Sequence, residues 1–342
     1  MKAVVITRHG GPEVFDYTNR PVPEMGPHDA LIRVKACALN RLDVWTRQGM
    51  PGVDIPMPHI LGCDVAGIVE RAGDRVRNVS AGQRVVVSPG QSCGKCARCR
   101  QGRDSLCPEF RILGFQIDGG YAEYVSVPSR FVMPVSARWS FEEWAAVPLV
   151  FVTAWHMLMT RAGLLRGDTV LIHAAGSGVG SAAIQVARWA GARVITTAGS
   201  DDKLARAKQL GAHETINYTT DDVAERVKAI TLGRGVDVVF EHIGPQTWPS
   251  SVKSLGKGGR LVTCGATTGP TVELDLRFVF TRELSIAGCY MGAQQELARV
   301  LKLVAAGKLK PIVDSVFPLR KAANAHEKML SRDHFGKIVL TP

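Results

Sequence analysis

Four of the eight cysteines stand close together, at a spacing suited to metal binding. Cys93, Cys96 and Cys99 form two overlapping Cys-x-x-Cys pairs, and Cys107 follows within the same short segment. Such turns place thiolates on one side of a tetrahedral zinc ion, and four thiolates leave no coordination position open. The pattern therefore predicts one structural zinc that folds its own segment and takes no part in chemistry. Two disulfides are the alternative, which is less common in an intracellular protein.

A glycine-rich segment is suited to binding phosphate. It follows a predicted strand at 168–173 and precedes a predicted helix at 181–190. Glycines permit a tight turn and close approach of the backbone, and a helix N-terminus offers free N–H groups to a pyrophosphate. A glycine loop alone is often only a turn, but this strand–loop–helix context is typical of dinucleotide binding. The candidate cofactor-binding residues are Gly176, Ser177, Gly178, Val179 and Gly180.

The next predicted strand, 193–197, bears on which dinucleotide binds. NAD-binding sites usually carry an acidic residue at the end of this strand. Here small residues follow the strand, and the first carboxylate is that of Asp201. Ser200 can donate a hydrogen bond to a 2′-phosphate and Lys203 brings positive charge, so that NADP(H) is favoured over NAD(H). The alternative makes Ser200 a helix N-cap and places Lys203 on a solvated face.

Two patterns of predicted elements position these segments. The first third of the chain has short β-like runs, such as 31–36 and 65–70, separated by Gly and Pro as in a compact antiparallel barrel. A helix is predicted over 141–160. Strands and helices then alternate, which indicates a parallel, doubly wound sheet. Further strands are expected at 214–217, 236–240, 259–263, 285–287 and 336–340, and further helices at 202–210, 222–232 and 295–306.

The composition disfavours several classes of protein. The 342 residues, 46% of them hydrophobic, are typical of a globular protein with two domains. No apolar run reaches the roughly 18 residues of a membrane helix and no secretory signal is present, so we expect a soluble, cytoplasmic protein without membrane contact. The formal charge of +11 suits a phosphorylated cofactor. It would also suit nucleic acid, but without long basic runs we expect no such partner.

Further motifs accompany these segments. They are Leu-Asn-Arg-Leu-Asp at 39–43, Gly-Cys-Asp-Val-Ala-Gly at 62–67, Leu-Val-Phe-Val-Thr-Ala-Trp at 149–155 and Gly-Lys-Ile-Val-Leu at 336–340. Over nearly the whole chain, the set resembles the medium-chain dehydrogenase/reductase superfamily, where zinc-type dehydrogenases grade into quinone oxidoreductases. The resemblance implies an α/β fold with a GroES-like β-barrel catalytic domain and a Rossmann doubly wound parallel sheet. The catalytic domain would comprise 1–145 and 290–342, with the zinc lobe at 93–107, and the Rossmann domain 146–289.

The departures from this family pattern concern the catalytic metal. Zinc alcohol dehydrogenases of the superfamily hold that metal with a Cys, a Gly-His-Glu segment and a later Cys. At these positions the chain has Asn40, Gly-Cys-Asp at 62–64 and an apolar residue near 149, and Leu42 replaces the hydroxyl that relays the alcohol proton. Only Cys63 and Asp64 remain as donors, whereas a catalytic zinc needs three protein ligands and an open position. We therefore expect no catalytic zinc.

The resemblance also implies roles for single residues. Thr153 matches the position that hydrogen-bonds the nicotinamide carboxamide. Ser200, Lys203 and Tyr218 match the positions at which NADPH-dependent relatives hold the adenosine phosphate; a core aromatic at a strand end is the alternative for Tyr218. The candidates to line the substrate pocket, and so the candidate catalytic residues, are Asn40, Trp45 and Cys63.

Three functions follow from these interpretations. The first is NAD(P)H-dependent reduction of a quinone or an activated C=C bond, by direct hydride transfer in a cleft between the domains, because such acceptors need no Lewis acid. The second is a zinc-type alcohol dehydrogenase with an atypical metal site. The third is a nucleotide-sensing or RNA-binding protein with little catalysis. We expect a small-molecule substrate and a homodimer or homotetramer.

Overall fold

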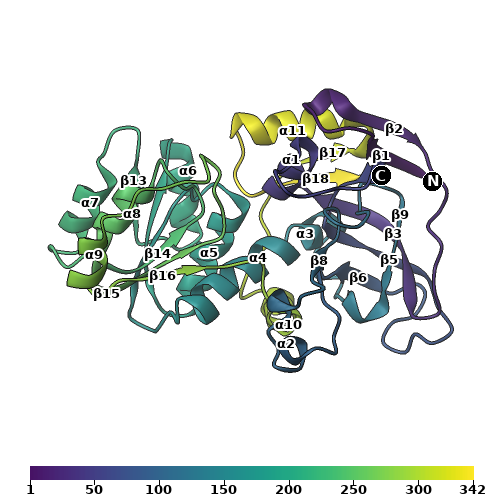
Figure 1. The fold of residues 1–342 in the computed structure, drawn as a ribbon, viewed down its shortest axis with the longest axis horizontal. Coiled ribbons are helices and arrows are strands. Elements are labelled where there is room, and N and C mark those ends of the chain that lie inside the picture. The colour runs from purple at the N-terminus through teal and green to yellow at the C-terminus, as the bar shows by residue number, and fades with distance from the viewer. The chain divides into compact units, whose positions relative to one another are not determined.

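The computed structural model describes all residues from 1 to 342, and the contacts within it divide the chain into two units (Figure 1). The barrel unit consists of 1–149, 293–307 and 311–342, and the Rossmann unit consists of 150–292 and 308–310. From the sequence we expected the domains to meet between residues 145 and 146 and between residues 289 and 290. These boundaries of independently folding domains stay a prediction. No helix has both the length and the apolar character needed to cross a membrane.

The barrel unit is built on a seven-stranded sheet with the order β10-β6-β5-β3-β18-β17, in which β9 also pairs with β3. The long strands β3 (Asp29–Ala38) and β5 (Asp64–Ala72) run antiparallel. The strand β18 (Lys337–Thr341), from the other end of the chain, pairs antiparallel with β3. Residues from both ends of the chain therefore share one sheet. Its other strands are β6 (Arg84–Val87), β9 (Tyr124–Pro128), β10 (Val132–Pro134) and β17 (Val313–Pro318).

Smaller elements complete the barrel unit. A three-stranded sheet and a two-stranded sheet lie outside the main one. The helix α11, at 322–331, has no counterpart among the elements expected from the sequence. The strands are β1 (Lys2–Ile6), β2 (Phe15–Asn19), β4 (His59–Ile60), β7 (Gly90–Gln91) and β8 (Arg111–Ile112), and the helices are α1 (Arg41–Gln48), α2 (Ala97–Arg100), α3 (Phe141–Ala145), α10 (Gln294–Ala305) and α11 (Ala322–Ser331).

The Rossmann unit contains six parallel strands in the order β13-β12-β11-β14-β15-β16. The first of these six strands in the sequence, β11, pairs with β12 on one side and with β14 on the other. The order of the strands therefore reverses beside β11. Dinucleotides bind at the carboxyl ends of strands at such a reversal. The strands are β11 (Thr169–Ile172), β12 (Arg193–Ala198), β13 (Glu214–Asn217), β14 (Val236–Glu241), β15 (Leu255–Thr263) and β16 (Ser285–Gly288).

The expected single helix over 141–160 is wrong. The segment contains α3, then α4 (Pro148–Trp155), then a π-helical stretch (His156–Arg161). Pro148 explains the break after α3, because proline has no N–H to continue the helix and is tolerated only in a first turn. The helices of the Rossmann unit are α5 (Gly178–Trp189), α6 (Asp201–Gln209), α7 (Val223–Ile230), α8 (Trp248–Ser254) and α9 (Leu276–Thr281).

The inner strands β11, β12 and β14 of the Rossmann sheet are buried, as expected for parallel strands covered by helices, whereas the edge strand β16 is largely exposed. Its core includes Leu171 and Val239 on neighbouring strands, together with Trp248 and Val252 of α8. The helices α8 and α9 were not expected from the sequence. The short α8 is recognisable only through the apolar side chains that it places against the sheet.

Candidate active site and zinc site

The glycine loop lies between β11 and α5, and Ser177 is the N-cap residue of that helix. Its hydroxyl accepts a hydrogen bond from Gly180 N at 2.9 Å and donates one to Ala174 O at 2.9 Å. A side chain at Gly180 would collide with the Ala174 carbonyl, so glycine is required by close packing. The cap explains why α5 begins at Gly178, earlier than expected. The loop fits a pyrophosphate, since backbone N–H groups are gathered at a helix N-terminus.

β12 ends at Ala198 and leads through Gly199 and Ser200 into α6. Ser200 is the N-cap residue of α6 and accepts from Lys203 N at 3.5 Å, as in the alternative interpretation of this residue. Asp201 accepts a hydrogen bond from Asn217 Nδ2 at 3.1 Å. Tyr218 is exposed, which excludes a core position, and its hydroxyl lies against Gly199, where a Cβ would meet it at 2.6 Å.

Thr153 carries a buried hydroxyl that has no hydrogen-bond partner. The residue lies on α4, is 5% exposed, and its Oγ1 is unsatisfied. An unsatisfied buried polar atom is costly and points to an absent partner. The expected contact with a nicotinamide carboxamide would supply one.

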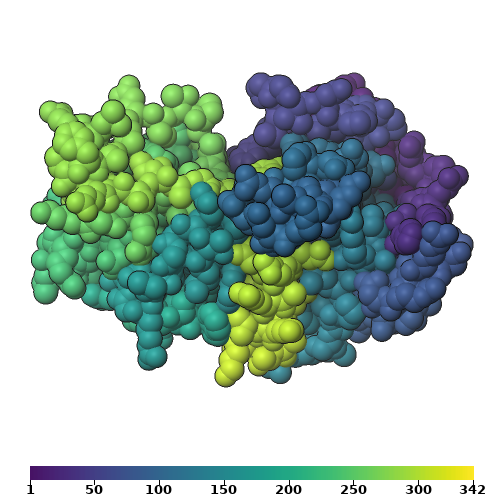
Figure 2. Space-filling view, turned by 60° about the horizontal axis from the view of Figure 1, so that its bottom comes forward, coloured from purple at the N-terminus to yellow at the C-terminus, as the bar shows by residue number.

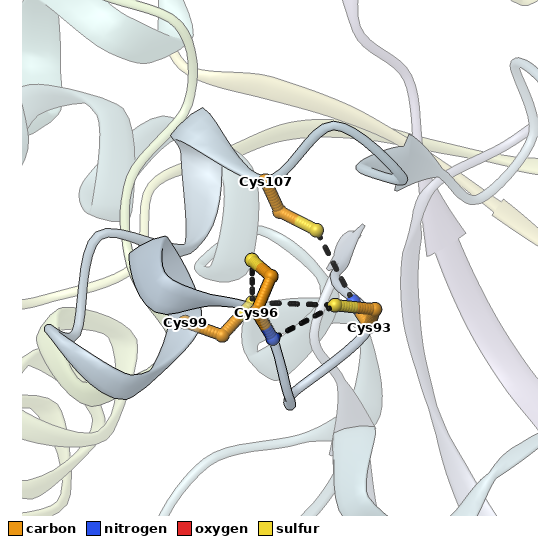
Figure 3. Close-up of side chains that lie close together, drawn as sticks. All are labelled: Cys93, Cys96, Cys99 and Cys107. Atoms are coloured by element: carbon orange, nitrogen blue, oxygen red, sulfur yellow. Dashed lines mark hydrogen bonds between the residues drawn. The ribbon is translucent and has the colours of Figure 1, made fainter.

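The four cysteines gather around one point (Figure 3). Their sulfur atoms all lie within 4.8 Å of one another, with 3.5 Å between Cys96 and Cys99 and 3.9 Å between Cys93 and Cys99. No disulfide joins them. A tetrahedral zinc with Zn–S bonds of ~2.3 Å has S···S edges of roughly 3.8 Å, so the cluster fits a structural zinc. Hydrogen bonds from Lys95 N–H and Cys96 N–H lower the pKa of Cys93 to about 7, which favours the thiolate that zinc requires.

The zinc lobe is attached to the rest of the barrel unit by hydrogen bonds at both of its ends. Arg130 donates to the carbonyl oxygens of Ser92, at 2.6 Å, and Cys93, at 3.1 Å. Asp104 accepts from Gln294 N, the first residue of α10, at 2.8 Å. Figure 2 shows the blue atoms of the lobe against the yellow atoms of the C-terminal part of the barrel unit. The lobe thus supplies an acceptor for the first N–H of α10, beside the N-cap residue Ala293.

A second polar cluster lies where β3 ends and α1 begins. Asn40 N donates to Asp43 Oδ2 at 2.6 Å, which begins α1. Asn40 Nδ2 donates to Asp64 Oδ2 at 2.8 Å and lies 3.3 Å from Cys63 Sγ. The structure therefore brings together Asn40 and Cys63, two of the three residues expected to line the substrate pocket. Trp45, the third, is a half-buried residue of α1.

Lys337 completes this cluster and was not expected there from the sequence. Its Nζ donates to Asn40 Oδ1 at 2.5 Å and to Asp64 Oδ2 at 2.9 Å. Leu149 N donates to the other oxygen, Asp64 Oδ1, at 2.7 Å. Both carboxylate oxygens of Asp64 are thus in use. The Gly-Lys-Ile-Val-Leu motif contained the signal, but nothing local in it indicates a partner as distant as Asp64.

The electrostatics of the cluster disfavour a second metal. Burial raises the pKa of Asp43 from 3.8 to about 7, although hydrogen bonding and the charge of Lys337 lower it. Burial and the neighbouring carboxylates raise the pKa of Cys63 well above its usual value, so its thiol stays protonated. The ammonium of Lys337 beside Asp64 repels a cation, and no three donors of this cluster lie close enough to share one metal ion. Over residues 1–342, the one group of at least three ligands that could hold an ion is the cysteine cluster.

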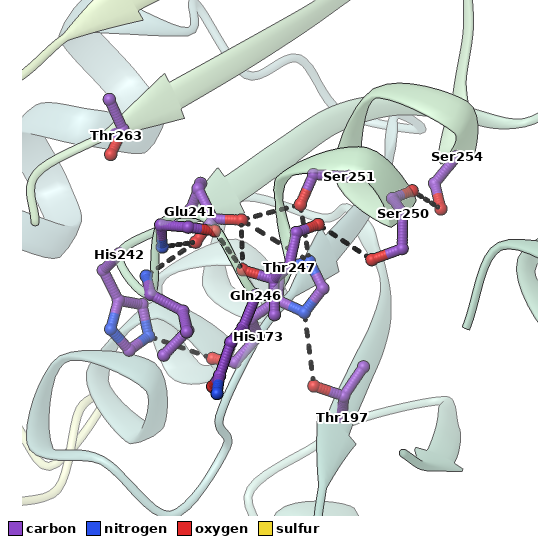
Figure 4. A network of polar contacts seen from close by, with 12 residues as sticks. His173, Thr197, Glu241, His242, Gln246, Thr247, Ser250, Ser251, Ser254 and Thr263 are labelled. Carbon is purple, nitrogen blue, oxygen red and sulfur yellow. Dashed lines mark hydrogen bonds and ion pairs between the residues drawn. The ribbon is translucent and has the colours of Figure 1, made fainter. Parts of the chain in front are cut away.

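A third polar network, inside the Rossmann unit, was not expected from the sequence (Figure 4). Glu241, at the end of β14, is fully buried and accepts from Ile243 N at 2.6 Å and from Ser251 Oγ at 2.7 Å. Ser251 Oγ also lies 2.9 Å from His173 Nε2. His173 comes directly after β11, at the start of the segment that leads into the glycine loop. The network therefore connects the ends of two neighbouring strands.

Comparisons with known proteins support this architecture. Residues 26–137 match the family model of the alcohol dehydrogenase GroES-like domain, and residues 178–306 match that of the zinc-binding dehydrogenases. The chain is 31% identical to the quinone oxidoreductase of Lama guanicoe, over 99% of this chain and 97% of that protein. The chain belongs to the medium-chain dehydrogenase/reductase superfamily.

Two further likenesses show how widely chemistry varies among members of this superfamily. The crotonyl-CoA reductase of Streptomyces avermitilis is 34% identical, over 93% of this chain and 80% of that protein. A crystal structure described as an NAD-dependent alcohol dehydrogenase is 47% identical, with a TM-score of 0.97 and complete coverage of both chains.

The comparisons decide the general class of reaction. The protein is an NAD(P)-dependent oxidoreductase of the medium-chain superfamily, with a GroES-like domain, a Rossmann-type sheet and a four-cysteine site that fits zinc. The chain is 47% identical to the alcohol dehydrogenase and 31% identical to the quinone oxidoreductase. The comparisons therefore favour the alcohol dehydrogenase alternative over the quinone interpretation.

Proposed function

We propose that the protein transfers hydride from NADPH to a quinone or an activated C=C bond without a catalytic zinc. The observation that carries this proposal is the state of Asp64, whose carboxylate is occupied by Lys337, Asn40 and Leu149. An ammonium 2.9 Å from Asp64 Oδ2 repels a metal cation from the remaining donors. Alcohol oxidation without a Lewis acid has no means of stabilising an alkoxide.

The chain's own residues contribute positioning and electrostatics. A bound nicotinamide supplies the hydride, and an acceptor with an electron-poor carbon needs no metal to polarise it. Both ends of the Asn40 amide are hydrogen-bonded, so Asn40 would act by fixing Cys63 and Lys337 in place. Thr153 would bind the carboxamide of the ring. Trp45 and Cys63 would line an apolar pocket for the acceptor.

NADPH is the proposed cofactor because β12 itself ends without a carboxylate, and the first acids after it, Asp201 and Asp202, belong to the first turn of α6. Asp201 is hydrogen-bonded to Asn217, which leaves Ser200, Lys203 and Tyr218 as the proposed contacts of a 2′-phosphate. The NAD-dependent relative at 47% identity gives NADH as the competing cofactor. A homodimer or homotetramer stays a prediction.

A second candidate is alcohol dehydrogenation at an atypical metal site, and the 47% identical alcohol dehydrogenase favours it. In that case Cys63 and Asp64 would be metal ligands, and the Asp64–Lys337 pair would have to open. Because the two candidates differ in the number of metal ions, metal analysis separates them directly.

The test combines metal analysis with an acceptor screen. The proposal expects one zinc per chain, an unchanged zinc content in Cys63→Ala, and NADPH-dependent turnover of quinones or enones. Two zincs per chain, one of them lost in Cys63→Ala, together with alcohol oxidation by NAD⁺, would establish the second candidate. Running NADPH and NADH in parallel tests the cofactor choice in the same screen.

A further inference from the structure

The buried network around Glu241 lies at the carboxyl ends of β11 and β14, where parallel strands of this fold present their ligand site. The two strands are direct neighbours, with Ile172 opposite Phe240. The turn after β14 is held by Glu241, which accepts from Gly244 N at 3.2 Å as well as Ile243 N at 2.6 Å. Thr247, at the start of α8, donates to the same carboxylate at 2.8 Å.

The hydrogen atoms of this network can be assigned one by one. Four donors point at Glu241, so its carboxylate is an acceptor only. Ser251 has a single hydrogen and donates it to Glu241 Oε2, so its oxygen can only accept from His173. His173 Nε2 must therefore carry the proton. His173 Nδ1 then accepts from Thr197 Oγ1, at 3.4 Å.

The protonation states agree with this assignment. Burial lowers the pKa of His173 to about 4, more than the charge of Glu241 raises it, so the ring is neutral with one N–H. Burial raises the pKa of Glu241, but the charge that His173 carries when it is protonated and the hydrogen bonds from the surrounding donors lower it further, so the carboxylate is ionised. The residue types match those of a nucleophilic triad, but the order does not. Ser251 lies between the acid and the imidazole and gives its hydrogen to the carboxylate, which excludes activation by His173.

The chain of hydrogen bonds ends at the glycine loop. Thr197 Oγ1 accepts from Ala174 N at 3.3 Å, and Ala174 has a φ of +50°. A left-handed conformation is costly for alanine and persists only where the surroundings hold it. The carbonyl of Ala174 is the group that Ser177 binds and that Gly180 packs against. Ala174 is therefore the residue about which the loop turns.

We propose that Glu241 is a positioning residue of the dinucleotide site, which sets the glycine loop through Ser251, His173 and Thr197. This proposal rests on the proposed function, because it assumes that the loop binds a dinucleotide. Every hydrogen in the chain points toward the carboxylate: Ala174 to Thr197, Thr197 to His173, His173 to Ser251 and Ser251 to Glu241. The charge of Glu241 thus selects the tautomer of His173. The tautomer in turn orients Thr197 Oγ1, which accepts from Ala174 N in the loop.

The variant Glu241→Gln tests this direction. An amide nitrogen facing Ser251 donates to it, so that the Ser251 hydrogen turns to His173 Nε2 and the ring must carry its proton on Nδ1. Thr197 Oγ1 then accepts from both His173 Nδ1 and Ala174 N, and its own buried hydrogen loses its acceptor. This favours another rotamer of Thr197 and weakens the Ala174 contact. We expect ¹⁵N NMR of histidine-labelled protein without nucleotide to show the Nε2–H tautomer in the wild type and Nδ1–H in Glu241→Gln. We also expect NADPH to bind about tenfold more weakly, the effect of one hydrogen bond.

Thr247→Val is the matched control, because it removes a donor to the same carboxylate outside the chain. It should leave the tautomer of His173 unchanged. Ser251→Ala is the second variant if Glu241→Gln does not fold, and it should give a mixture of tautomers together with weaker binding of NADPH. A His173→Gln variant assigns the signals.

An Nε2–H ring in a folded Glu241→Gln, or unchanged NADPH affinity despite a reversed tautomer, would overturn the proposal. Failure of the assumption that the loop binds a dinucleotide is distinguishable, because the wild-type protein would then bind neither NADPH nor NADH while the tautomer still responds to Glu241→Gln.

Discussion

Lys337 Nζ lies 2.9 Å from the carboxylate of Asp64, although 273 residues separate the two in the sequence. Both side chains are buried, with 4% and 0% exposed. Removing one partner of a buried ion pair leaves an uncompensated charge, so we expect Lys337→Met to lower the free energy of unfolding by about 3–5 kcal/mol. Urea unfolding measures this. The double variant Lys337→Met, Asp64→Asn should recover part of the loss, and additive losses would contradict a direct interaction.

The zinc lobe should depend on each of its four thiolates. We expect Cys99→Ser to bind less than one zinc per chain and to unfold at a lower temperature, because metal binding and folding of the lobe are coupled. Metal analysis by mass spectrometry and thermal unfolding measure the two effects. Cys289→Ser is the control, since Cys289 donates to Met291 O and lies outside the cluster. Equal zinc content in both variants would exclude the site.

Gly180 permits the close packing of the glycine loop, so that Gly180→Ala should displace it. The added Cβ collides with the backbone carbonyl of Ala174, which cannot move without altering the loop. We expect at least tenfold weaker binding of NADPH, measured by fluorescence titration. At Gly288 a Cβ meets no atom within 4 Å, so Gly288→Ala should bind normally. Normal binding by Gly180→Ala would show that the loop is not the phosphate site.

Ser200 lies where NAD-binding relatives of the fold place an acid. We expect Ser200→Asp to weaken NADPH binding by about tenfold or more through repulsion of the 2′-phosphate, and to leave NADH binding nearly unchanged. Ser200→Ala separates the loss of the helix cap from the effect of charge. Equal losses for both dinucleotides in Ser200→Asp would contradict a 2′-phosphate at this position.

His326 should make the barrel unit sensitive to acid. It is buried, its Nε2 lies 3.2 Å from Tyr121 Oη, and burial lowers its pKa from 6.5 to about 3. Below pH 6.5 the unfolded chain binds the proton that the folded protein refuses, so stability falls as the pH drops from 6.5 toward 3. The slope from this group is about 1.4 kcal/mol per pH unit.

The variant His326→Gln keeps a polar group near Tyr121 but does not titrate. Urea unfolding between pH 7 and pH 4 should therefore show a smaller loss of stability in His326→Gln than in the wild type. Parallel curves for the two proteins would show that His326 is not held neutral.

The features predicted correctly from the sequence are local, whereas the contacts that were not predicted depend on packing between distant segments. The cysteine spacing and the strand–loop–helix around Gly178 are complete within short segments, so their geometry follows from residue type and order. Lys337 meets Asp64 only because β18 joins the sheet of β3. Glu241 meets His173 only because β14 lies beside β11. Neither pairing leaves a periodic or spacing signal.

The prediction of one helix over 141–160 was wrong for a different reason. The segment is almost entirely apolar from Trp144 to Trp155, so that hydrophobic periodicity could not distinguish one helix from several. Proline in a first turn and a π-helical stretch after Trp155 both depend on backbone hydrogen bonding, which side-chain polarity does not report.

The position of β18 has a consequence for synthesis. Residues 337–341 emerge from the ribosome only after the whole Rossmann unit has been made, yet they form an inner strand of the sheet that begins with β3. The Rossmann unit can thus fold while the barrel sheet still lacks β17 and β18 and Asp64 still lacks its cation. The pocket residues beside Asp64 acquire their final arrangement last, when β18 pairs with β3.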